Sequence, residues 1–558
     1  MKKIRFCIIS AIILGLSLGC SYHPNPNPTP EDTQTIPKPG FTLESPTPFL
    51  PLELTPTTIP PKKIIVSIPA YWDLNHTIVI KNDAIELVTT DSESDCKLTD
   101  EGFTIPAGEI VLNVVKQFPI TEDGLTMGEL ADVIRKSHTE NGPAIRIDER
   151  IYDFVTKLLP VDSGDLFTGE LKNLTDFLYK NKDNLAIIPF EETIPAYKVL
   201  QVDGQSPFDQ GFDSKSYPLT FQVGYVCKQP KDQALLDSLT NPFVSNRDSK
   251  KFASVLITGT TALTRAIAAK MELNGMNYPG EKVKFWFDQA DISHISNEVS
   301  FNKNCPPANP YQTDLMFCSR PEYAQLFAYL GVDIVELSGN HLADKGVPAL
   351  ENTFSILREM RIPYYAAGFN REEAEQPVRF DINENKFSFL GCNQAGPSFV
   401  WLTEILSGVL PCDMDRMAGL VEAEVNAGYL PIVTFQYGET YQFDALPYQK
   451  RDFRQMVDAG AVIVSGSQAH VPMSMEIYRG AFIHYGLGNL FFDQMDIPVV
   501  GTRREFLDRH IFYNGRYMGV QLLTAMLEDY SQPRPMTNTE RDSLLQDAFK
   551  YFQRVEEE

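Results

Sequence analysis

The stretch DAGAVIVSGSQAHVP, Asp458 to Pro472, decides the fold. A short apolar run is followed by small and polar residues and then by His470, and the next segment, GAFIHYGLGN (480–489), is again apolar before it turns polar. Short apolar runs that end in turn residues predict buried strands. A polar loop at the carboxyl end of such a strand is where α/β sheets form their sites.

The same pattern occurs three more times upstream. It is found in FASVLITGTTALTRAIAAKME (252–272), in VDIVELSGNH (332–341) with the helix-like VPALENTFSILREMR (347–361) after it, and in YLPIVTFQYGE (429–439). Strands that alternate with helices predict an α/β fold with parallel strands. We therefore assign residues 252–530 to one α/β domain whose loops meet at one sheet edge.

The part of the chain before this domain predicts a smaller α/β unit at 63–228. KKIIVSIPAYW, LAIIPF and YKVLQVDG are strand-like, whereas TMGELADVIRK and LKNLTDFLYKNK are helix-like. Residues 229–251 are polar and predict a linker, and residues 531–558 predict a C-terminal surface helix with an acidic tail. The segment AIIPFEETIPAYKVLQVDGQSP resembles extracytoplasmic solute-binding proteins, and the alternative for this unit is a structural or docking domain.

The first 62 residues predict export and membrane attachment. A basic MKKIRF, a short apolar run and SLGC ending at Cys20 are typical of a lipoprotein signal peptide over residues 1–20, and residues 21–62 form a Pro/Thr-rich linker. Cys20 would carry the lipid and hold the protein on the extracytoplasmic face of the cell membrane. The alternative is an ordinary cleaved signal or a retained anchor.

The formal net charge of −24 argues against nucleic acid as a partner, because non-specific binding to phosphates depends on Lys and Arg. The six cysteines outside the signal are even in number and contain no C-x-x-C pair, which makes a cysteine zinc site unfavourable. An exported protein can form disulfides. The order of the cysteines favours the pairs Cys96–Cys227, Cys305–Cys318 and Cys392–Cys412 over free buried thiols, because each pair then stays within one region.

The motifs GVDIVELSGNHLADKG, DAGAVIVSGSQAHVP and FIHYGLGNLFFD resemble the capsule-synthesis (CapA-type) family, which is implicated in poly-γ-glutamate capsule production. The resemblance covers about residues 252–495. It implies a C-terminal metallophosphoesterase-like α/β sandwich, preceded here by the smaller α/β domain. It also implies an extracellular polymer or an anionic ligand as partner.

Several site residues of the family are present in this chain. Asn297 and Glu298 match its second loop, and Asn340 and His341 match its third loop. Asp344 follows at a position where the family often has an aspartate. The resemblance therefore implies catalytic or ligand-binding roles for these side chains.

The remaining loops match only in part. Glu439 matches the fourth loop, but Gln436 stands where the family has histidine. His470 matches the last histidine of the fifth loop, whereas its usual partner is Gln468. Thr260 replaces the aspartate of the first loop.

These replacements weaken the metal site that the resemblance implies. Two divalent cations about 4 Å apart repel by roughly 16 kcal/mol at an effective dielectric constant of about 20, and a bridging carboxylate normally offsets this. Thr260 cannot supply that charge. Three alternatives follow: a dinuclear centre, one divalent metal ion held by Glu298, His341 and His470, or a site without metal.

The replaced side chains remain polar, which favours a cleft that still binds a polar ligand. Arg265 is a candidate partner for an anion, or else an exposed helix residue. Gly486 and Gly488 let the backbone approach the site, and Asn489 is a candidate for orienting a neighbouring histidine. The sequence thus predicts a lipoprotein for capsule or cell-envelope polymer synthesis or processing. The alternative is a non-catalytic polymer- or solute-binding lipoprotein.

Overall fold

The computed structural model describes residues 63–68, 84–88, 93–104, 106–137, 144–159, 168–169, 171–239, 244–499 and 501–556. The predicted lipidation site Cys20 and the linker at 21–62 lie outside the described residues.

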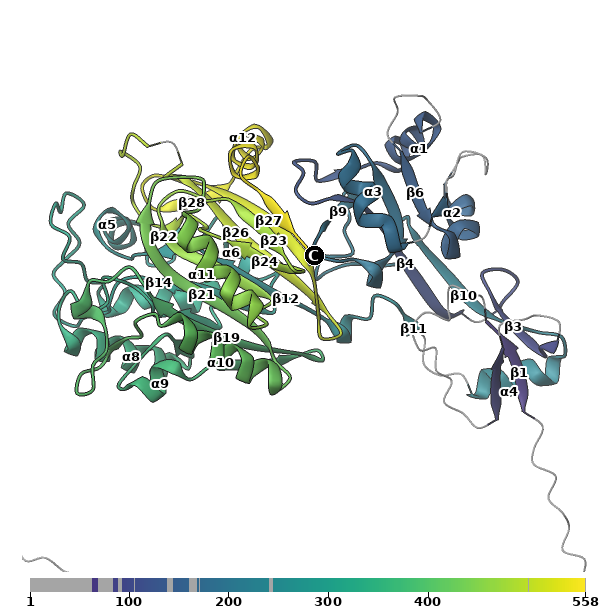
Figure 1. The fold of residues 1–558 in the computed structure, drawn as a ribbon, viewed down its shortest axis with the longest axis horizontal. Helices are drawn as coiled ribbons and strands as arrows, with labels where there is room; N and C mark the ends of the chain where they lie inside the picture. The colour runs from purple at the N-terminus through teal and green to yellow at the C-terminus, as the bar shows by residue number, and fades with distance from the viewer. Residues whose placement is uncertain are drawn as a thin grey trace, which may run out of the picture. The chain divides into compact units, whose positions relative to one another are not determined.

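The second half of the chain forms two β-sheets that pack face to face, with helices outside them (Figure 1). The first sheet contains β12 (Phe252–Thr258), β13 (Thr260–Thr261), β14 (Ile292–Asn297), β15 (Ile334–Glu336), β16 (Tyr364–Tyr365), β25 (Asn489–Phe491), β26 (Arg504–Tyr513), β27 (Arg516–Glu528) and β28 (Gln532–Pro535). The second contains β18 (Val378–Ile382), β19 (Asn385–Asn393), β21 (Leu430–Thr440), β22 (Ile463–Ala469), β23 (Met475–Tyr478), β24 (Ala481–His484) and β29 (Gln553–Val555). A short pair is formed by β17 (Ala367–Gly368) and β20 (Gly408–Val409).

Three apolar layers hold this sandwich together. The layer between the sheets joins side chains such as Val255 and Ile292 of the first sheet to Phe389 and Ile432 of the second. The outer face of the first sheet packs on α5 (Arg265–Asn274), α6 (Lys284–Phe287), α7 (Gln325–Leu330) and α8 (Val347–Met360). The outer face of the second sheet packs on α10 (Met414–Asn426) and α11 (Pro447–Asp458), with α9 (Arg371–Glu375) beside them. The predicted α/β sandwich is therefore confirmed.

The central strands of both sheets are parallel. In the first sheet β12, β14, β15 and β16 run in one direction, and in the second β19, β21, β22 and β24 do so. Every residue of β12, β14 and β22 is buried, as expected of strands covered on both faces. The carboxyl ends of the parallel strands of each sheet meet at one edge, and the polar loops of the sequence emerge there. The expectation of a single sheet edge was wrong, because β14 and β15 belong to the first sheet and β21 and β22 to the second.

The first part of the chain forms a separate mixed sheet. Its strands are β1 (Ile64–Ser67), β2 (Ile85–Val88), β3 (Cys96–Thr99), β4 (Pro106–Gln117), β5 (Gly124–Leu125), β6 (Ile145–Asp148), β7 (Thr168–Gly169), β8 (Leu185–Pro189), β9 (Tyr197–Val202), β10 (Thr220–Cys227) and β11 (Val244–Ser245). Its helices are α1 (Met127–Lys136), α2 (Tyr152–Leu158), α3 (Leu174–Lys180) and α4 (Pro230–Leu239). The predicted helices at TMGELADVIRK and LKNLTDFLYKNK correspond to α1 and α3.

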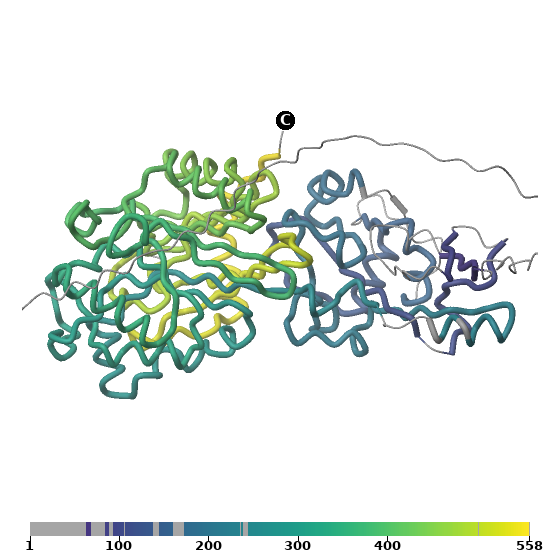
Figure 2. Tube along the Cα trace, turned by 90° about the horizontal axis from the view of Figure 1, so that it is seen from below, coloured from purple at the N-terminus to yellow at the C-terminus, as the bar shows by residue number. Residues whose placement is uncertain are grey.

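Two segments differ from the sequence-based expectation. Residues 229–251, predicted as a polar linker, contain α4 and β11, and β11 pairs with β4. The C-terminal segment forms α12 (Asn538–Phe549), but the chain then returns to the second sheet, where β29 pairs with β23. Figure 2 shows the yellow C-terminal strands among the teal and green segments of the sandwich. Polarity alone did not reveal these pairings, because short edge strands need few apolar residues.

All three predicted disulfides are present: Cys96–Cys227, Cys305–Cys318 and Cys392–Cys412. The first joins the ends of β3 and β10, whose residues Cys96 and Cys227 are paired in register. Within the described part of the chain, we find no helix with the length and apolar character needed to span a bilayer.

Candidate functional site

A cavity of about 940 Å³ opens at the carboxyl ends of β14, β21 and β22. Six of the residues singled out from the sequence line it: Arg265, Glu298, His341, Glu439, Gln468 and His470. These residues come from five different loops, so the sandwich brings together side chains that lie far apart along the chain. A hollow of this size accommodates a small ligand or the end of a polymer chain.

Glu298 lies at the floor of this cavity, directly after β14. Its main-chain N–H donates to the carbonyl of Thr261, 2.9 Å away, and only 2% of the residue is exposed. One carboxylate oxygen, Oε1, accepts a hydrogen bond of 3.3 Å from Gln436, whereas Oε2 has no partner among the described residues. Burial raises the pKa of Glu298, and the nearby imidazoles of His341 and His470 partly offset this rise.

The side-chain amide of Gln436, on β21, lies at the centre of the polar residues. Its Nε2 donates to Oδ1 of Asn340 at 2.9 Å and also lies within hydrogen-bond distance of Oε1 of Gln468 and Oε1 of Glu298. Glu298 can only accept when it is ionised, which favours the orientation that turns the amide nitrogen of Gln436 towards it. Three oxygen atoms thus converge on a nitrogen.

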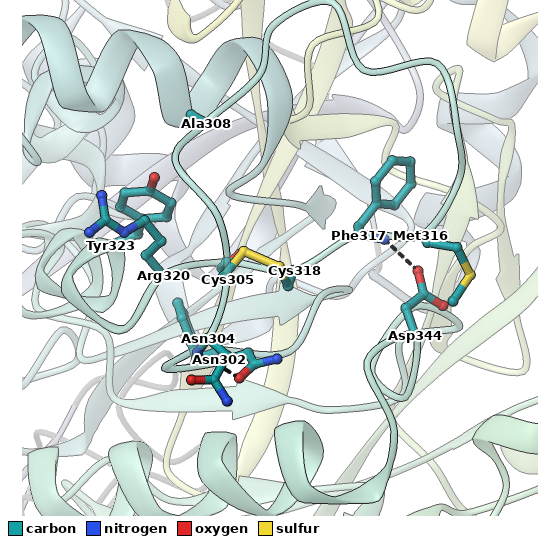
Figure 3. Close-up of a disulfide and its surroundings, with 12 residues drawn as sticks. Asn302, Asn304, Cys305, Ala308, Met316, Phe317, Cys318, Arg320, Tyr323 and Asp344 are labelled. Atoms are coloured by element: carbon teal, nitrogen blue, oxygen red, sulfur yellow. Dashed lines mark hydrogen bonds between the residues drawn. A yellow bond between two sulfur atoms is a disulfide. The ribbon is translucent and has the colours of Figure 1, made fainter.

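His341 is held from behind by Asp344. Its Nδ1 lies 2.8 Å from Oδ2 of Asp344, which also accepts the main-chain N–H of Phe317 at 2.7 Å (Figure 3). Burial lowers the pKa of His341, but the bond to Asp344 and the charge of Glu298 outweigh it, and the pKa is raised. The sequence predicted a binding role for Asp344, whereas the structure places it where it orients the imidazole.

His470 is held in the same way by Asn489. Nδ1 of His470 lies 2.8 Å from Oδ1 of Asn489, and Nδ2 of Asn489 donates to the carbonyl of Thr502 at 3.1 Å. This is the contact with a neighbouring histidine that the sequence predicted for Asn489. Both imidazoles therefore use Nδ1 for positioning, which leaves Nε2 of each ring for the cavity. Glu439 is near, with Oε1 3.9 Å from Nε2 of His470.

Thr260 and Asn297 lie below the cavity and are not among its lining residues. Oγ1 of Thr260 accepts the main-chain N–H of Gln468 at 3.2 Å, which ties β13 to β22. Nδ2 of Asn297 donates to the carbonyl of Val299 at 2.9 Å, while its buried Oδ1 has no partner among the described residues. Their positions support the loops and do not provide direct contact with a ligand.

Close backbone approach at Gly259 and Gly488 brings β13 and β25 together. The carbonyl of Gly488 accepts the N–H of Thr260 at 3.0 Å, and a Cβ on Gly259 would lie 2.1 Å from that carbonyl oxygen. Gly488 itself has φ of +88°, a conformation that favours glycine. The predicted geometric role of Gly488 is thus confirmed at this position.

Arg265 at the start of α5 lines the cavity and is not an exposed helix residue. Its guanidinium pairs with Asp493, and Oδ2 of Asp493 accepts the N–H of Ala266 at 2.9 Å. The sequence did not predict a role for Asp493, or for the aromatic residues Phe317 and Phe492 over which Arg265 lies. Asp493 and Phe492 follow Asn489 in a loop that the sequence analysis had already selected. Their closeness to Asn489 in the sequence could therefore have identified them as site residues.

A loop closed by the Cys305–Cys318 disulfide forms one wall of the cavity. Tyr311, Gln312 and Leu315 of this loop line the cavity, and Tyr311 is 87% exposed. Phe317 precedes Cys318 and contacts His341 with ring centroids 4.6 Å apart. Figure 3 shows the Cys305–Cys318 disulfide and the hydrogen bond from the main chain of the neighbouring Phe317 to the side chain of Asp344.

The donor atoms of the cavity do not match the metal site that the sequence resemblance implied. Over the residues that the structure describes, no group of three or more His, Cys, Asp or Glu side chains is arranged to hold a metal ion. Glu298, His341 and His470 share the cavity, but the oxygen atoms nearest Glu298 converge on the amide of Gln436. The side chains as placed do not fit the implied three-ligand set.

The fold and the cavity define an α/β sandwich protein with a polar site at the strand ends. Residues 254–494 match the model of the family described as bacterial capsule synthesis protein PGA_cap, and this domain is similar to CapA-type capsule-synthesis proteins. It is 24% identical over 304 residues to the capsule biosynthesis protein CapA of Bacillus anthracis, covering 53% of this chain and 72% of that protein. It is 23% identical over 244 residues to the PGA biosynthesis protein CapA of Bacillus subtilis, covering 43% of this chain and 63% of that protein.

Solved structures show weaker likeness. NAD nucleotidase (NadN) of Haemophilus influenzae covers 55% of this chain and 57% of its own, at 10% identity and a TM-score of 0.31. An ABC-type phosphate transport receptor from Vibrio cholerae covers 32% of this chain and 93% of its own, at 11% identity and a TM-score of 0.26.

Proposed function

We propose that this protein takes part in the synthesis or processing of a capsule or cell-envelope polymer of the poly-γ-glutamate type, and that it binds the polymer in the cavity at the strand ends. The match of residues 254–494 to the capsule-synthesis family model supports the class of polymer. The observation that carries the proposal is the convergence of Glu298, His341 and His470 on a single hollow.

We propose further that binding does not depend on a dinuclear metal centre. The amide of Gln436 takes the central position among the oxygen atoms of Glu298, Asn340 and Gln468. The amide NH₂ group satisfies these acceptors by hydrogen bonding, although it leaves the charge of Glu298 uncompensated. Metal-binding loops of the family have a histidine where this chain has Gln436.

The test is the binding of fluorescein-labelled poly-γ-glutamate to the full chain, with metal content measured on the same sample. Wild-type protein is expected to bind the polymer equally well with and without EDTA. His341→Ala and His470→Ala are expected to weaken binding at least about tenfold, the loss typical of a charge-assisted hydrogen bond. Arg479→Ala, on the surface of the second sheet, serves as the control that leaves binding unchanged.

Two results would contradict the proposal in different ways. Stoichiometric metal that is lost in both histidine variants would rule out the metal-independent site. Failure of the wild-type protein to bind poly-γ-glutamate and other anionic envelope polymers would rule out the binding function.

Metal-independent hydrolysis of the polymer is a second candidate. It is favoured by the two imidazoles, each with Nδ1 held by a partner and Nε2 free for general acid–base chemistry. The test is the chain length of poly-γ-glutamate after incubation with protein and EDTA. Shortening that disappears in His470→Gln but persists in Glu359→Gln, an exposed residue of α8, would support hydrolysis, and unchanged chain length would exclude it.

For location, we propose lipid attachment at Cys20 on the extracytoplasmic face of the membrane. The signal-like N-terminus and the three disulfides, which suit an oxidising compartment, support this. In Triton X-114 partitioning the wild type is expected in the detergent phase and Cys20→Ala in the aqueous phase. Cys7→Ala, within the apolar run of the signal, is the matched control and should remain in the detergent phase; wild-type protein in the aqueous phase would contradict the anchor.

A further inference from the structure

The unpartnered oxygen of Glu298 points to what the ligand must supply. Only 2% of Glu298 is exposed, the residue lines the cavity, and its Oε2 has no hydrogen-bond partner among the described residues. A buried carboxylate oxygen without a donor is unfavourable, because it has lost water and gained nothing in return. A ligand that completes this site therefore brings a hydrogen-bond donor to the carboxylate of Glu298.

The charges around the cavity indicate that this donor is cationic. Five carboxylates line the cavity: Glu298, Glu439, Asp493, Asp496 and Asp529. The lining cations Arg265 and Lys270 are already paired, with Asp493 and Asp529. The other three carboxylates form no ion pair with Lys or Arg in the described residues, so the hollow attracts positive charge and disfavours the carboxylates of a polyanion.

The walls of the cavity add aromatic rings. Phe317 lies against His341 with centroids 4.6 Å apart, and Tyr441 and Phe492 lie 5.6 and 4.8 Å from His470. Aromatic faces attract ammonium and guanidinium groups, as the stacking of Arg265 over Phe317 at 4.9 Å illustrates. A cavity that offers both carboxylates and aromatic faces suits an ammonium group.

We infer that the cavity binds an ammonium group of its ligand, with the carboxylate of Glu298 as the acceptor and the aromatic rings beside His341 and His470 in the same cavity. This inference rests on the proposed function. A poly-γ-glutamate chain carries one free ammonium group, at its amino terminus, whereas its α-carboxylates repeat along its whole length. The site would thus select the amino end of the chain. The first α-carboxylate is bonded to the same carbon as the ammonium group and enters with it, whereas the carboxylates of the later residues remain outside the acidic hollow.

The experiment compares γ-linked glutamyl oligomers with a free and with an acetylated amino terminus, by calorimetric titration of the full chain. Acetylation removes the charge and leaves the rest of the ligand unchanged. The free oligomer is expected to bind at least about tenfold more tightly, since a hydrogen bond between charged groups in a buried site is being removed. Glu298→Gln should bring the ratio of the two dissociation constants close to one, and Glu359→Gln should leave it as in the wild type.

A second variant tests the ammonium site in case Glu298→Gln does not fold. Phe492→Leu keeps the apolar wall but removes a ring face, and it should reduce the preference for the free amine while the thermal midpoint stays near that of the wild type. A third arm uses putrescine, a small diamine, as the competitor. Displacement of the free-amine oligomer by putrescine supports the ammonium site.

The outcomes separate the inference from the proposed function. Equal affinity for the free and acetylated oligomers overturns the ammonium site and leaves polymer binding intact. Binding of putrescine without binding of either oligomer supports the ammonium site, identifies a small amine as its source and overturns the polymer function. A preference for the free amine that persists undiminished in Glu298→Gln overturns the role of Glu298.

Discussion

The amide nitrogen of Gln436 donates a 2.9 Å hydrogen bond to Oδ1 of Asn340, although 96 residues separate the two. The same nitrogen lies 3.3 Å from Oε1 of Glu298 and within hydrogen-bond distance of Oε1 of Gln468. An NH₂ group has two hydrogens, so three acceptors share two donors. This shortage makes the position of Gln436 sensitive to any change that removes its donors.

Gln436→Glu should therefore destabilise the protein and create an affinity for hard divalent cations. The new carboxylate would lie beside the buried carboxylate of Glu298. Even if the amides of Asn340 and Gln468 turn to donate to it, Glu298 loses its donor, and an unsatisfied buried group costs about 1–3 kcal/mol. Mg²⁺ or Ca²⁺, which prefer oxygen ligands, should restore part of the loss. The measurement is the thermal midpoint with and without the cation.

The control for this experiment is Gln376→Glu at the exposed end of α9, which should respond to neither the substitution nor the cation. If Gln436→Glu keeps the wild-type midpoint in EDTA, the amide does not hold the three oxygens together. Cation-dependent stabilisation of equal size in the wild type and in Gln436→Glu would also contradict the prediction.

Sequence patterns were sufficient for the arrangement of the strands but not for the details of the site. Buried runs such as 252–258 and 463–469 have hydrophobic residues that suit parallel strands, and parallel strands place their polar ends at one edge. That rule applies to each sheet separately, and the packing of the two sheets face to face then brings Glu298, His341 and His470 to one cavity. The rule depends on the direction of the strands, and the alternation of strand-like and helix-like segments indicates that direction.

The second layer of the site was not predictable in this way. Asp493 and Phe317 reach the cavity through long loops. The course of such loops depends on a disulfide and on packing, and neither of these produces a periodic pattern in the sequence. The orientation of Gln436 depends on partners from three other loops. Asp344 was recognised as part of the site, but only coordinates could place it behind His341 and out of the cavity.

Gly259→Ala should disrupt the junction between β13 and β25, whereas Gly419→Ala should stabilise the protein. A Cβ at Gly259 would lie 2.1 Å from the carbonyl oxygen of Gly488, and its two nearest neighbours are backbone atoms that cannot rotate away. Overpacking of this kind costs about 1–3 kcal/mol or more. Gly419 lies in α10, where an added methyl group would meet no heavy atom within 4 Å, so alanine should gain about 1 kcal/mol of helix stability.

Urea unfolding of the two alanine variants measures these opposite effects. Gly259→Ala should also weaken ligand binding, because Thr260 and Asn489 on the two strands position Gln468 and His470. Equal stability of the two variants would show that the backbone near Gly259 can move apart at little cost.

Removal of the Cys305–Cys318 disulfide should affect binding more than its effect on stability suggests. The bond spans 13 residues, for which the loss of chain entropy in the unfolded state corresponds to about 3 kcal/mol. Because Phe317 donates to Asp344 next to this bond, loosening the loop should also release His341. The paired serine variant should therefore bind poly-γ-glutamate more weakly than the wild type at a temperature where both are folded.

The Cys96–Cys227 disulfide provides the opposite case. It spans 131 residues, so its removal should cost more, about 4–5 kcal/mol in the same entropy estimate, but it lies in the first part of the chain and contacts none of the cavity residues. The paired serine variant at these positions should unfold more easily and still bind with wild-type affinity at low temperature. If both disulfide variants lose binding in proportion to their stability, the loop has no special role.

The pH dependence of stability should contain a term from His510, which is buried between the sheets. Burial lowers the pKa of His510 to about 4, against about 6.5 in an unfolded chain. Below pH 6.5 the unfolded state therefore binds a proton that the folded state refuses. The stability contributed by the neutral imidazole is fully present above pH 6.5 and falls as the pH decreases towards 4, by about 1.4 kcal/mol for each pH unit.

Buried carboxylates with raised pKa, such as Glu505, shift the total in the opposite direction, so the test is a difference between two proteins. The free energy of unfolding of wild type minus that of His510→Gln should decrease by about 2 kcal/mol between pH 6.5 and 5. His294, whose pKa burial lowers to about 3, should give the same slope in His294→Gln. A difference that stays constant over this range would mean that His510 takes up its proton without unfolding, through the contact of its Nδ1 with Tyr517.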